Sequence, residues 1–231
     1  YEFEDVLEDD GIEDKEYTIK VTAFVQGDEV VIDYTGSSPQ AKGPINATLG
    51  VAYSASFNAM LHVTDESIPK NSGCFRPIRV IAPAGTIMNV NYPGSEVGGN
   101  TETHPLIVAC ILGAFSKASP TRVMASEGTT HGCFVFGGWD EDNDQPFGAF
   151  DFSYVGYGGR HNADGNDATD SINGNCGNTP TEVFETMFPW MVEEYALRQD
   201  SGGAGEHRGG LSISKTMLCT GGDMLISQMT N

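Results

Sequence analysis

Residues 103–117 read THPLIVACILGAFSK. Apolar side chains occur on all sides of a helix built from this stretch, and they include Leu106, Ile107, Val108, Ile111, Leu112 and Phe115. A helix that is apolar almost all round is normally buried. Thr103 is expected to cap this helix, with Pro105 in its first turn and Pro120 beyond its end. The stretch therefore predicts a central helix around which the remaining chain packs.

Strand patterns precede this helix. Residues 17–25 alternate apolar and polar side chains, and 30–34 form a return strand after a turn at Gly27 and Asp28. Farther along, the pattern predicts a helix at 50–63 and short strands at 78–82 and 87–90. Residues 1–16 are acid-rich and are expected to form an exposed lead-in.

The second half of the chain contains more predicted strands. They lie at 131–136, 147–155, 211–217 and 224–229, and the acidic loop WDEDND joins the first two. Residues 156–178 are dominated by Gly, Asn and Asp, and they predict a long irregular segment. Thr179, Pro180 and Glu182 form a capping-box pattern for a second helix, which Pro189 should kink. Strands and helices do not alternate strictly, so the predicted class is α+β: mixed and strand-rich, with a buried central helix and a second, capped helix.

The charge balance is strongly acidic. The chain has 32 Asp and Glu residues against 12 Lys and Arg, and its formal net charge is −20. Nucleic acid and membrane surfaces are themselves anionic, so the sequence predicts neither as a partner. Two explanations stay open, namely an acidic surface that keeps the protein hydrated in a salty cytoplasm and a dedicated basic partner.

The cysteines indicate a reduced compartment. The five cysteines are scattered along the sequence, which is typical of a reduced cytoplasmic protein. No two of them form a C-x-x-C pair, so the sequence does not predict a structural zinc site. The sequence contains no apolar run of 18 residues. Because the chain begins at Tyr1 and ends just after a strand-like run, we expect 1–231 to be an internal or C-terminal-half fragment of a longer polypeptide.

Four long phrases in fixed order resemble one family. They are DYTGSSPQAKGPINA (33–47), IPKNSGCFRPIRVIAPAGTIMN (68–89), GGNTETHPLIVACILGAF (98–115) and NTPTEVFETMFPWMVEEYALRQDSGGAGEHRGGL (178–211). Their sequences are similar to those of the hydantoinase B/5-oxoprolinase family, whose B-type chains are over twice as long as this chain. Within this family, GNCGNTPTEVFETMFPW looks closer to the hydantoinase branch than to the related acetone and acetophenone carboxylases.

The resemblance implies a division of labour. ATP and Mg²⁺ bind to a hydantoinase A-type subunit, which phosphorylates the small-molecule substrate, and the B-type subunit carries the activated intermediate onward to water or to a carboxyl group. The resemblance also implies that divalent-metal ligands lie near the start of the full chain, outside this fragment, so no metal site is expected here. The sequence agrees with this division because it contains no G-x-x-x-x-G-K-[ST] loop.

Two glycine-rich stretches are candidates for binding an anion. Gly98, Gly99 and Asn100 precede the buried helix, whose N-terminus favours negative charge. The alternative is a simple turn into that helix. Arg208 lies in DSGGAGEHRGG at 200–210, where either backbone N–H groups cradle a phosphate or a tight turn with positive φ forms, fixed by Arg208 and Asp200.

Four residues are candidates for catalysis. Glu102, His131, His161 and Asp164 carry groups suited to general acid–base chemistry. Asp164, Asp167 and Asp170 recur every three residues, which does not match the alternate spacing of an EF-hand calcium loop, so solvated Asx turns are the alternative.

Three hypotheses about function follow. The first is the substrate-handling B-type subunit of an ATP-dependent cyclic-amide hydrolase, the second a component of an ATP-dependent ketone carboxylase, and the third a non-catalytic scaffold that docks the ATPase subunit.

Overall fold

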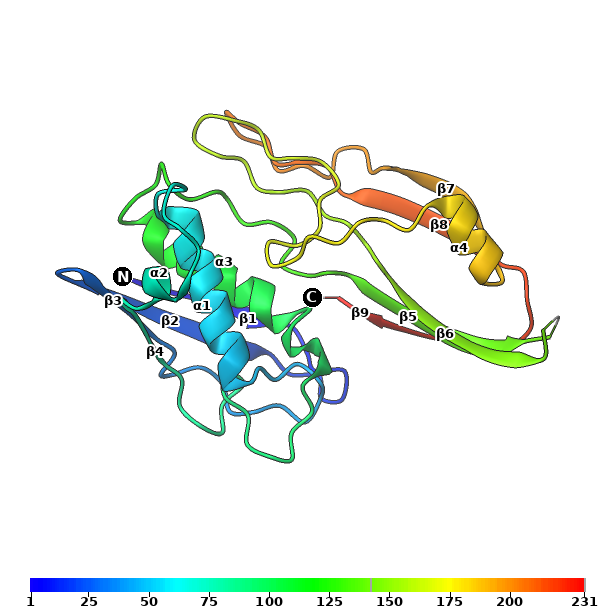
Figure 1. The fold of residues 1–231 in the computed structure, drawn as a ribbon, viewed down its shortest axis with the longest axis horizontal. Coiled ribbons are helices and arrows are strands. Elements are labelled where there is room, and N and C mark those ends of the chain that lie inside the picture. The colour runs from blue at the N-terminus through cyan, green and yellow to red at the C-terminus, as the bar shows by residue number, and fades with distance from the viewer. Residues whose placement is uncertain (142, 231) are drawn as a thin grey trace.

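The computed structural model describes residues 1–141 and 143–230, which form two parts (Figure 1). In the first part a four-stranded sheet of order β1-β2-β3-β4 is covered on one face by two helices. Its elements are β1 (Glu2–Leu7), β2 (Tyr17–Gln26), β3 (Glu29–Asp33), α1 (Leu49–Val63), α2 (Ser72–Phe75), β4 (Ile78–Ile81), the 3₁₀ turn η1 (Val97–Gly99) and α3 (Thr103–Ser116). Strands β1 to β3 are antiparallel, whereas β3 and β4 run parallel because the chain crosses over through α1.

The core of the first part lies between the sheet and α3. Strand β2 alternates as its sequence predicts, with Tyr17, Ile19 and Val21 almost fully buried. Helix α3 packs against α1, β1 and β2, and eleven of its residues are buried. The prediction of a buried central helix is therefore confirmed.

The second part contains two smaller sheets. One has the order β6-β5-β9, and the other is the two-stranded ribbon β7-β8, with helix α4 beside the ribbon (Figure 1). The bounds are β5 (Cys133–Asp140), β6 (Gln145–Phe152), α4 (Thr181–Met187), β7 (Trp190–Leu197), β8 (Ile213–Cys219) and β9 (Met224–Met229). A cluster of aromatic side chains connects β5, α4 and β7, with Phe136, Phe184 and Trp190 at its centre. The α+β class is confirmed.

The expected exposed lead-in contains a strand and an anchor. Residues Glu2–Leu7 form β1, which pairs with β2, although most of its side chains are exposed. Asp10 is only 1% exposed and accepts hydrogen bonds from the Tyr17 hydroxyl and from Gly43 N, both at 2.8 Å. Backbone and Tyr17 hydrogen bonds outweigh burial and lower the pKa of Asp10. The acid-rich composition of residues 1–16 did not reveal that Asp10 is buried and hydrogen-bonded.

Four local predictions are wrong. Residues 87–90 form bridged turns and no strand, because Ile87 N and Val90 N bond to the loop before α1. Thr103 is not the N-cap of α3. It is the first helical residue, and its hydroxyl donates to Ile45 O. Helix α4 begins at Thr181 after Pro180 without any side-chain cap, and it ends at Met187, so Pro189 precedes strand β7 and kinks no helix.

Candidate active site at the start of α3

The turn before α3 is held against the chain's own loop. Gly98 N donates to Pro44 O at 2.7 Å, and Gly98 and Gly99 are both buried. A Cβ added at Gly99 would lie 2.1 Å from Asn46 O, which is far inside van der Waals contact. The close approach that these glycines permit is therefore to the loop that contains Asn46.

Glu102 follows this turn and is buried. The residue is only 3% exposed, and the Thr130 hydroxyl donates to its Oε2 at 2.5 Å. Burial raises the pKa of Glu102 to about 7, and the hydrogen bond from Thr130 offsets part of that rise. A carboxyl with a pKa near neutrality can both donate and accept a proton at physiological pH.

His131 follows Thr130 in the chain, and its Nε2 forms a hydrogen bond whereas its Nδ1 lies close to a carboxylate without a hydrogen bond of good geometry. Its Nδ1 lies 2.9 Å from Asp170 Oδ1, and its Nε2 lies 2.8 Å from Asn173 Oδ1. Asp170 also accepts from Cys176 N at 2.9 Å. A histidine whose orientation is fixed by a buried carboxylate has the geometry of an oriented acid–base group.

Backbone contacts bring this histidine to the start of α3. His131 N donates to Thr101 O at 3.1 Å, and Asn173 Nδ2 donates to Asn100 O at 2.9 Å. Glu102, His131 and the turn at Gly98, Gly99 and Asn100 are thus one assembly. We call Glu102, Thr130, His131, Asp170 and Asn173 the buried cluster.

His104 lies beside the buried cluster and is itself buried. It is 3% exposed, and its Nε2 lies 3.2 Å from the Ser54 hydroxyl. Burial, with a smaller contribution from nearby His131, lowers the pKa of His104 to about 4. His104 is therefore neutral at physiological pH.

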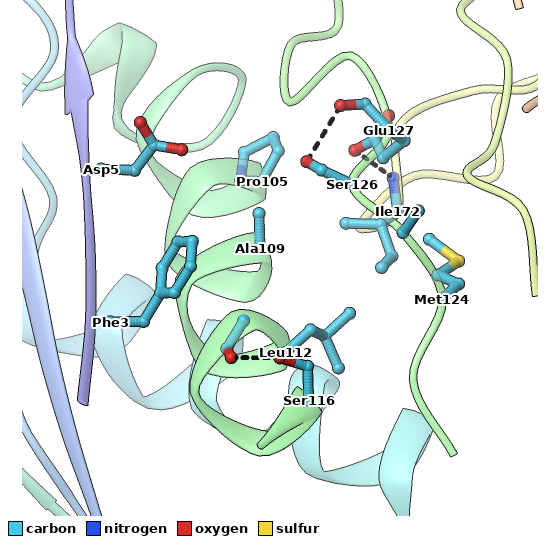
Figure 2. Close-up of a pocket in the computed structure, with 12 residues that line it drawn as sticks. Phe3, Asp5, Pro105, Ala109, Leu112, Ser116, Met124, Ser126, Glu127 and Ile172 are labelled. Atoms are coloured by element: carbon cyan, nitrogen blue, oxygen red, sulfur yellow. Dashed lines mark hydrogen bonds between the residues drawn. The ribbon is translucent and has the colours of Figure 1, made fainter. Parts of the chain in front are cut away.

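Glu127 is a candidate that the sequence did not single out. Its Oε1 accepts from the Ser171 hydroxyl at 2.8 Å and from Ile172 N at 3.2 Å, and burial raises its pKa. It lies at one end of a cavity of about 210 Å³ along α3, whose walls include Phe3 and Leu112 (Figure 2). Its sequence neighbours are polar and gave no sign of burial, because the residues that cover it lie in a distant loop.

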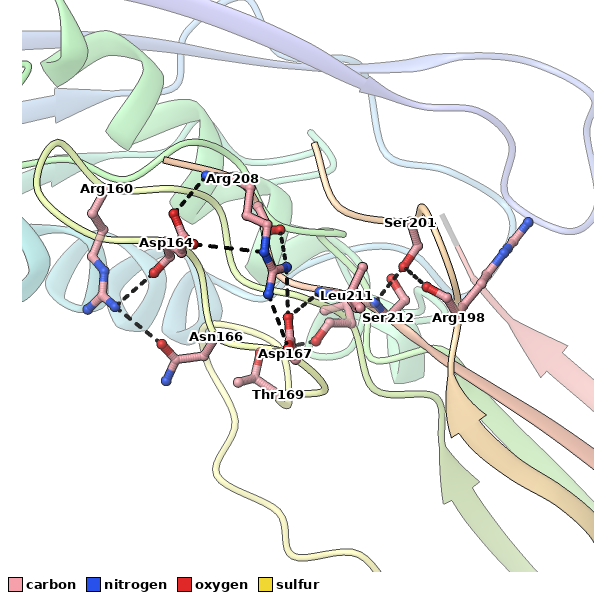
Figure 3. A network of polar contacts seen from close by, with 12 residues as sticks. Arg160, Asp164, Asn166, Asp167, Thr169, Arg198, Ser201, Arg208, Leu211 and Ser212 are labelled. Carbon is pink, nitrogen blue, oxygen red and sulfur yellow. Dashed lines mark hydrogen bonds and ion pairs between the residues drawn. The ribbon is translucent and has the colours of Figure 1, made fainter. Parts of the chain in front are cut away.

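The remaining candidates lie in a second, exposed network. Figure 3 shows Arg208 beside Asp164 and Asp167, with its Nη1 3.1 Å from Asp167 Oδ1 and its Nε 3.8 Å from Asp164 Oδ2. The side chains are 46% exposed for Arg208 and 53% for Asp164. His207 Nδ1 lies 3.5 Å from Asp164 Oδ1. We call Asp164, Asp167, His207 and Arg208 the exposed network.

His161 belongs to neither group. It is exposed and lines a hollow with His62 and Arg122. The expected tight turn at 200–210 has its positive φ at Asp200 (58°), and Arg208 binds Asp164 and Asp167 in place of Asp200. The structure therefore unites five of the eight candidates at the start of α3 and separates His161, Asp164 and Arg208 from them.

Three further observations concern the described residues. Among residues 1–141 and 143–230, no group of three or more His, Cys, Asp and Glu side chains could hold a metal ion. No described helix is long and apolar enough to cross a bilayer. Cys133, near His131, is buried, and burial raises the pKa of its thiol, which disfavours the nucleophilic thiolate.

The chain matches the family model for hydantoinase B/oxoprolinase over residues 1–231. It belongs to this family. An uncharacterized protein of Methanocaldococcus jannaschii is 36% identical over 202 residues, which are 87% of this chain and 35% of that protein. A Pseudomonas sp. protein, provisionally named as the B-type subunit of a D-/L-hydantoinase, is 31% identical over 212 residues, which are 89% of this chain and 35% of that protein. This chain thus spans about a third of the length of these two relatives.

Two solved structures share the fold. The ATP-dependent caprolactamase from Pseudomonas jessenii has a TM-score of 0.81 and 26% identity, over 94% of this chain and 38% of that chain. The nucleotide-free acetone carboxylase has a TM-score of 0.85 and 18% identity, over 100% of this chain and 33% of that chain. The second likeness shows the fold alone. The resemblance that the four sequence phrases indicate is confirmed.

Proposed function

We propose that this chain is part of the substrate-handling B-type subunit of an ATP-dependent cyclic-amide hydrolase of the hydantoinase/oxoprolinase type. The observation that carries the proposal is the buried cluster, which holds a near-neutral carboxyl and an oriented histidine in a chain of this family. The relatives named as part of a hydantoinase and as an ATP-dependent caprolactamase support hydrolysis of a cyclic amide.

In this proposal the buried cluster supplies acid–base chemistry. Glu102 and His131 would move protons to and from the activated intermediate, and Asp170 would position His131. Gly98 and Gly99 pack against the chain's own loop, so Asn100 and the positive end of α3 are the parts of the predicted anion site that would face an anionic group. Asp164 and Arg208 rank behind them because solvent screens the exposed network, and His161 ranks behind them because it is exposed and belongs to neither group.

ATP and Mg²⁺ belong to a hydantoinase A-type partner in this proposal, and any divalent metal would be held outside this chain, elsewhere in the full-length protein. The residues described here do not fit these groups: no Walker-type loop occurs in the sequence, and none of the described side chains form a metal cluster. The small-molecule substrate and the A-type subunit are the proposed partners, in the cytoplasm, with no role for nucleic acid or membrane.

The alternatives keep the same scaffold. A component of a ketone carboxylase would pass the activated intermediate to a carboxyl group in place of water, and the fold shared with acetone carboxylase is compatible with that reaction. A docking scaffold would use this chain only to hold the ATPase subunit.

The test is turnover of the full-length protein with its A-type partner, ATP and a panel of lactams, hydantoins and ketones. We expect ring opening that requires ATP and the partner and is independent of bicarbonate. His131→Ala and Glu102→Gln should each lower turnover by about 10²- to 10⁴-fold, whereas His161→Ala should leave it within about twofold of wild type. Bicarbonate-dependent ATP turnover would select the carboxylase, and full activity of both cluster variants would select the scaffold.

A further inference from the structure

A separate hollow lies where the last turn of α1 meets the segment that follows α3. Its volume is about 410 Å³, which is within the range of small-molecule sites. Its wall is formed by His62, by residues 121–124 and by residues 160–162. We call it the basic hollow. It contains no residue of the buried cluster or of the exposed network, so the proposed function leaves it without a role.

The basic hollow gathers positive charge in a chain that is mostly acidic. Arg122, Arg160, His62 and His161 line it, and no Asp or Glu is among its described lining residues. The whole chain, by contrast, has 32 Asp and Glu residues against 12 Lys and Arg. Partial burial and, after it, nearby Lys70 lower the pKa of His62, so a further cation is close by. An anion in the hollow would therefore meet cations in the wall and no carboxylate.

The two arginines are not committed to carboxylates. Within residues 1–141 and 143–230, neither side chain forms an ion pair. Arg160 Nη2 donates to the Asp164 carbonyl and to Asn166 Oδ1, both at 3.2 Å, and both acceptors are neutral (Figure 3). Hydrogen bonds from a neighbouring serine lower the pKa of Asp65, and Arg122 adds only the smallest contribution. The charges of Arg122 and Arg160 therefore remain largely uncompensated.

The polar groups of the wall suit a phosphate group better than a carboxylate. The guanidinium groups can only donate, and Thr121 and Asn162 add a hydroxyl and a side-chain amide. One guanidinium satisfies the two oxygens of a carboxylate, whereas a phosphate group presents three oxygens and more charge. Two arginines from separate segments match that larger demand. Val123 and Met124 supply apolar surface on the same wall, against which the organic part of an ester can pack.

We infer that the hollow walled by His62, Arg122, Arg160 and His161 binds a phosphate group, carried either by inorganic phosphate or by a small phosphate ester. Arg122 and Arg160 hold its charge, and the imidazole of His161 donates a ring N–H to it. The inference goes beyond the proposed function and does not rest on it, because no residue of the buried cluster takes part. It gives a role to His161, which the acid–base chemistry of that cluster does not use.

Three small anions test the selectivity of the basic hollow. The binding of inorganic phosphate, glycerol 3-phosphate and acetate to the full-length protein can be measured by calorimetry in the absence of ATP. We expect the better of the two phosphates to bind at least tenfold more tightly than acetate, and the one that binds more tightly identifies the source of the group. Equal binding of acetate would show a general attraction for anions and would overturn the inference, as would no binding of either phosphate.

Variants locate the binding site. Arg122→Gln and Arg160→Gln should each weaken phosphate binding by about tenfold, the effect of one hydrogen bond to a charged group. His161→Ala should have a smaller effect of about threefold, because a neutral donor contributes less. Arg198→Gln is the matched control, because Arg198 is also exposed and forms no ion pair with a described residue, but does not line the hollow.

The arginine positions are exposed, so the variants should fold, and thermal melts check this. Arg122→Lys and Arg160→Lys keep the charge without the planar fork, and they should retain more affinity than the Gln variants. Unchanged affinity in both Gln variants, or an equal loss in Arg198→Gln, overturns the inference. Because turnover is not measured, a failure of ATP-dependent hydrolysis contradicts the proposed function and leaves this inference intact.

Discussion

The buried cluster and the exposed network hold neighbouring parts of the same irregular segment, residues 156–178, but in different environments. His131 and Asp170 are 5% and 6% exposed at their side chains, whereas Arg208 and Asp164 are 46% and 53% exposed. Similar ion-pair geometry has different consequences in the two, because water and salt screen the exposed charges and not the buried ones. Burial, more than the presence of a charged pair, thus distinguishes an acid–base site from a surface clamp.

Removing Asp170 should give the largest effect. Asp170→Ala deprives Ser171 N and Cys176 N of their acceptor and removes the carboxylate beside His131 Nδ1, and the loss of two hydrogen bonds to a buried carboxylate lowers the free energy of unfolding by about 3–5 kcal/mol. The denaturant midpoint of the full-length protein measures this loss. Asp164→Ala is the matched control from the exposed network, and a loss there as large as that of Asp170→Ala would erase the contrast.

Glu102 should make stability depend on pH. Its pKa rises from 4.5 to about 7 on folding, so the folded state holds the proton more tightly, and the free energy of unfolding falls as pH rises through that window. The full loss is on the order of 3 kcal/mol. Glu102→Gln should therefore be more stable than wild type at pH 8, with little difference at pH 4, in melts at the two pH values. A variant less stable than wild type at pH 8 would show that the charged carboxylate is stabilised instead.

Adding a methyl group to a glycine should destabilise the protein near the buried cluster but not near the exposed network. Gly99→Ala places a Cβ 2.1 Å from Asn46 O, which should destabilise the protein by about 1–3 kcal/mol. Gly203→Ala, near the exposed network, meets no heavy atom within 4 Å and should be neutral or slightly stabilising. Thermal melts compare the two, and equal melting temperatures would argue against tight packing at the start of α3.

The smallest effect is expected at the exposed network itself. Arg208→Gln removes a screened pair with Asp167, so the loss of stability should be the smallest of the four and should vanish in roughly 0.5 M salt. Denaturation at low and high salt measures it. A larger loss that persists in salt would mean that Arg208 acts through its hydrogen bond to the Gly209 carbonyl or through packing.

The sequence predicted what depends on local pattern. The all-round apolarity of 103–117 was enough to place α3 in the core, and alternation was enough for β2, since both signals lie within the element itself. The capping prediction at Thr103 failed because a tertiary acceptor, Ile45 O, takes its hydroxyl. Tertiary contacts can override local capping preferences in this way.

The candidate site was less accessible to sequence reasoning. Glu102 and His131 were named as candidates, but Asp170 resembled the solvated Asx turns of its neighbours Asp164 and Asp167. The three acids have the same spacing and composition, and only folding shows that Asp170 turns inward to His131. Pairings between residues far apart in the sequence leave no periodic signal, so neither this pair nor Glu127 could be found without the structure.

The pairing of β5 with β9 has a consequence for synthesis on the ribosome. All strands and helices of the first part lie before residue 117, so that part has its full complement early during translation. Strand β5, with Phe134 and Val135, is made soon afterwards, but its neighbour β9 ends at Met229. At typical elongation rates this edge waits on the order of ten seconds for its partner. Over that interval the nascent chain presents one unpaired edge of the β5-β6 hairpin to chaperones and to neighbouring nascent chains.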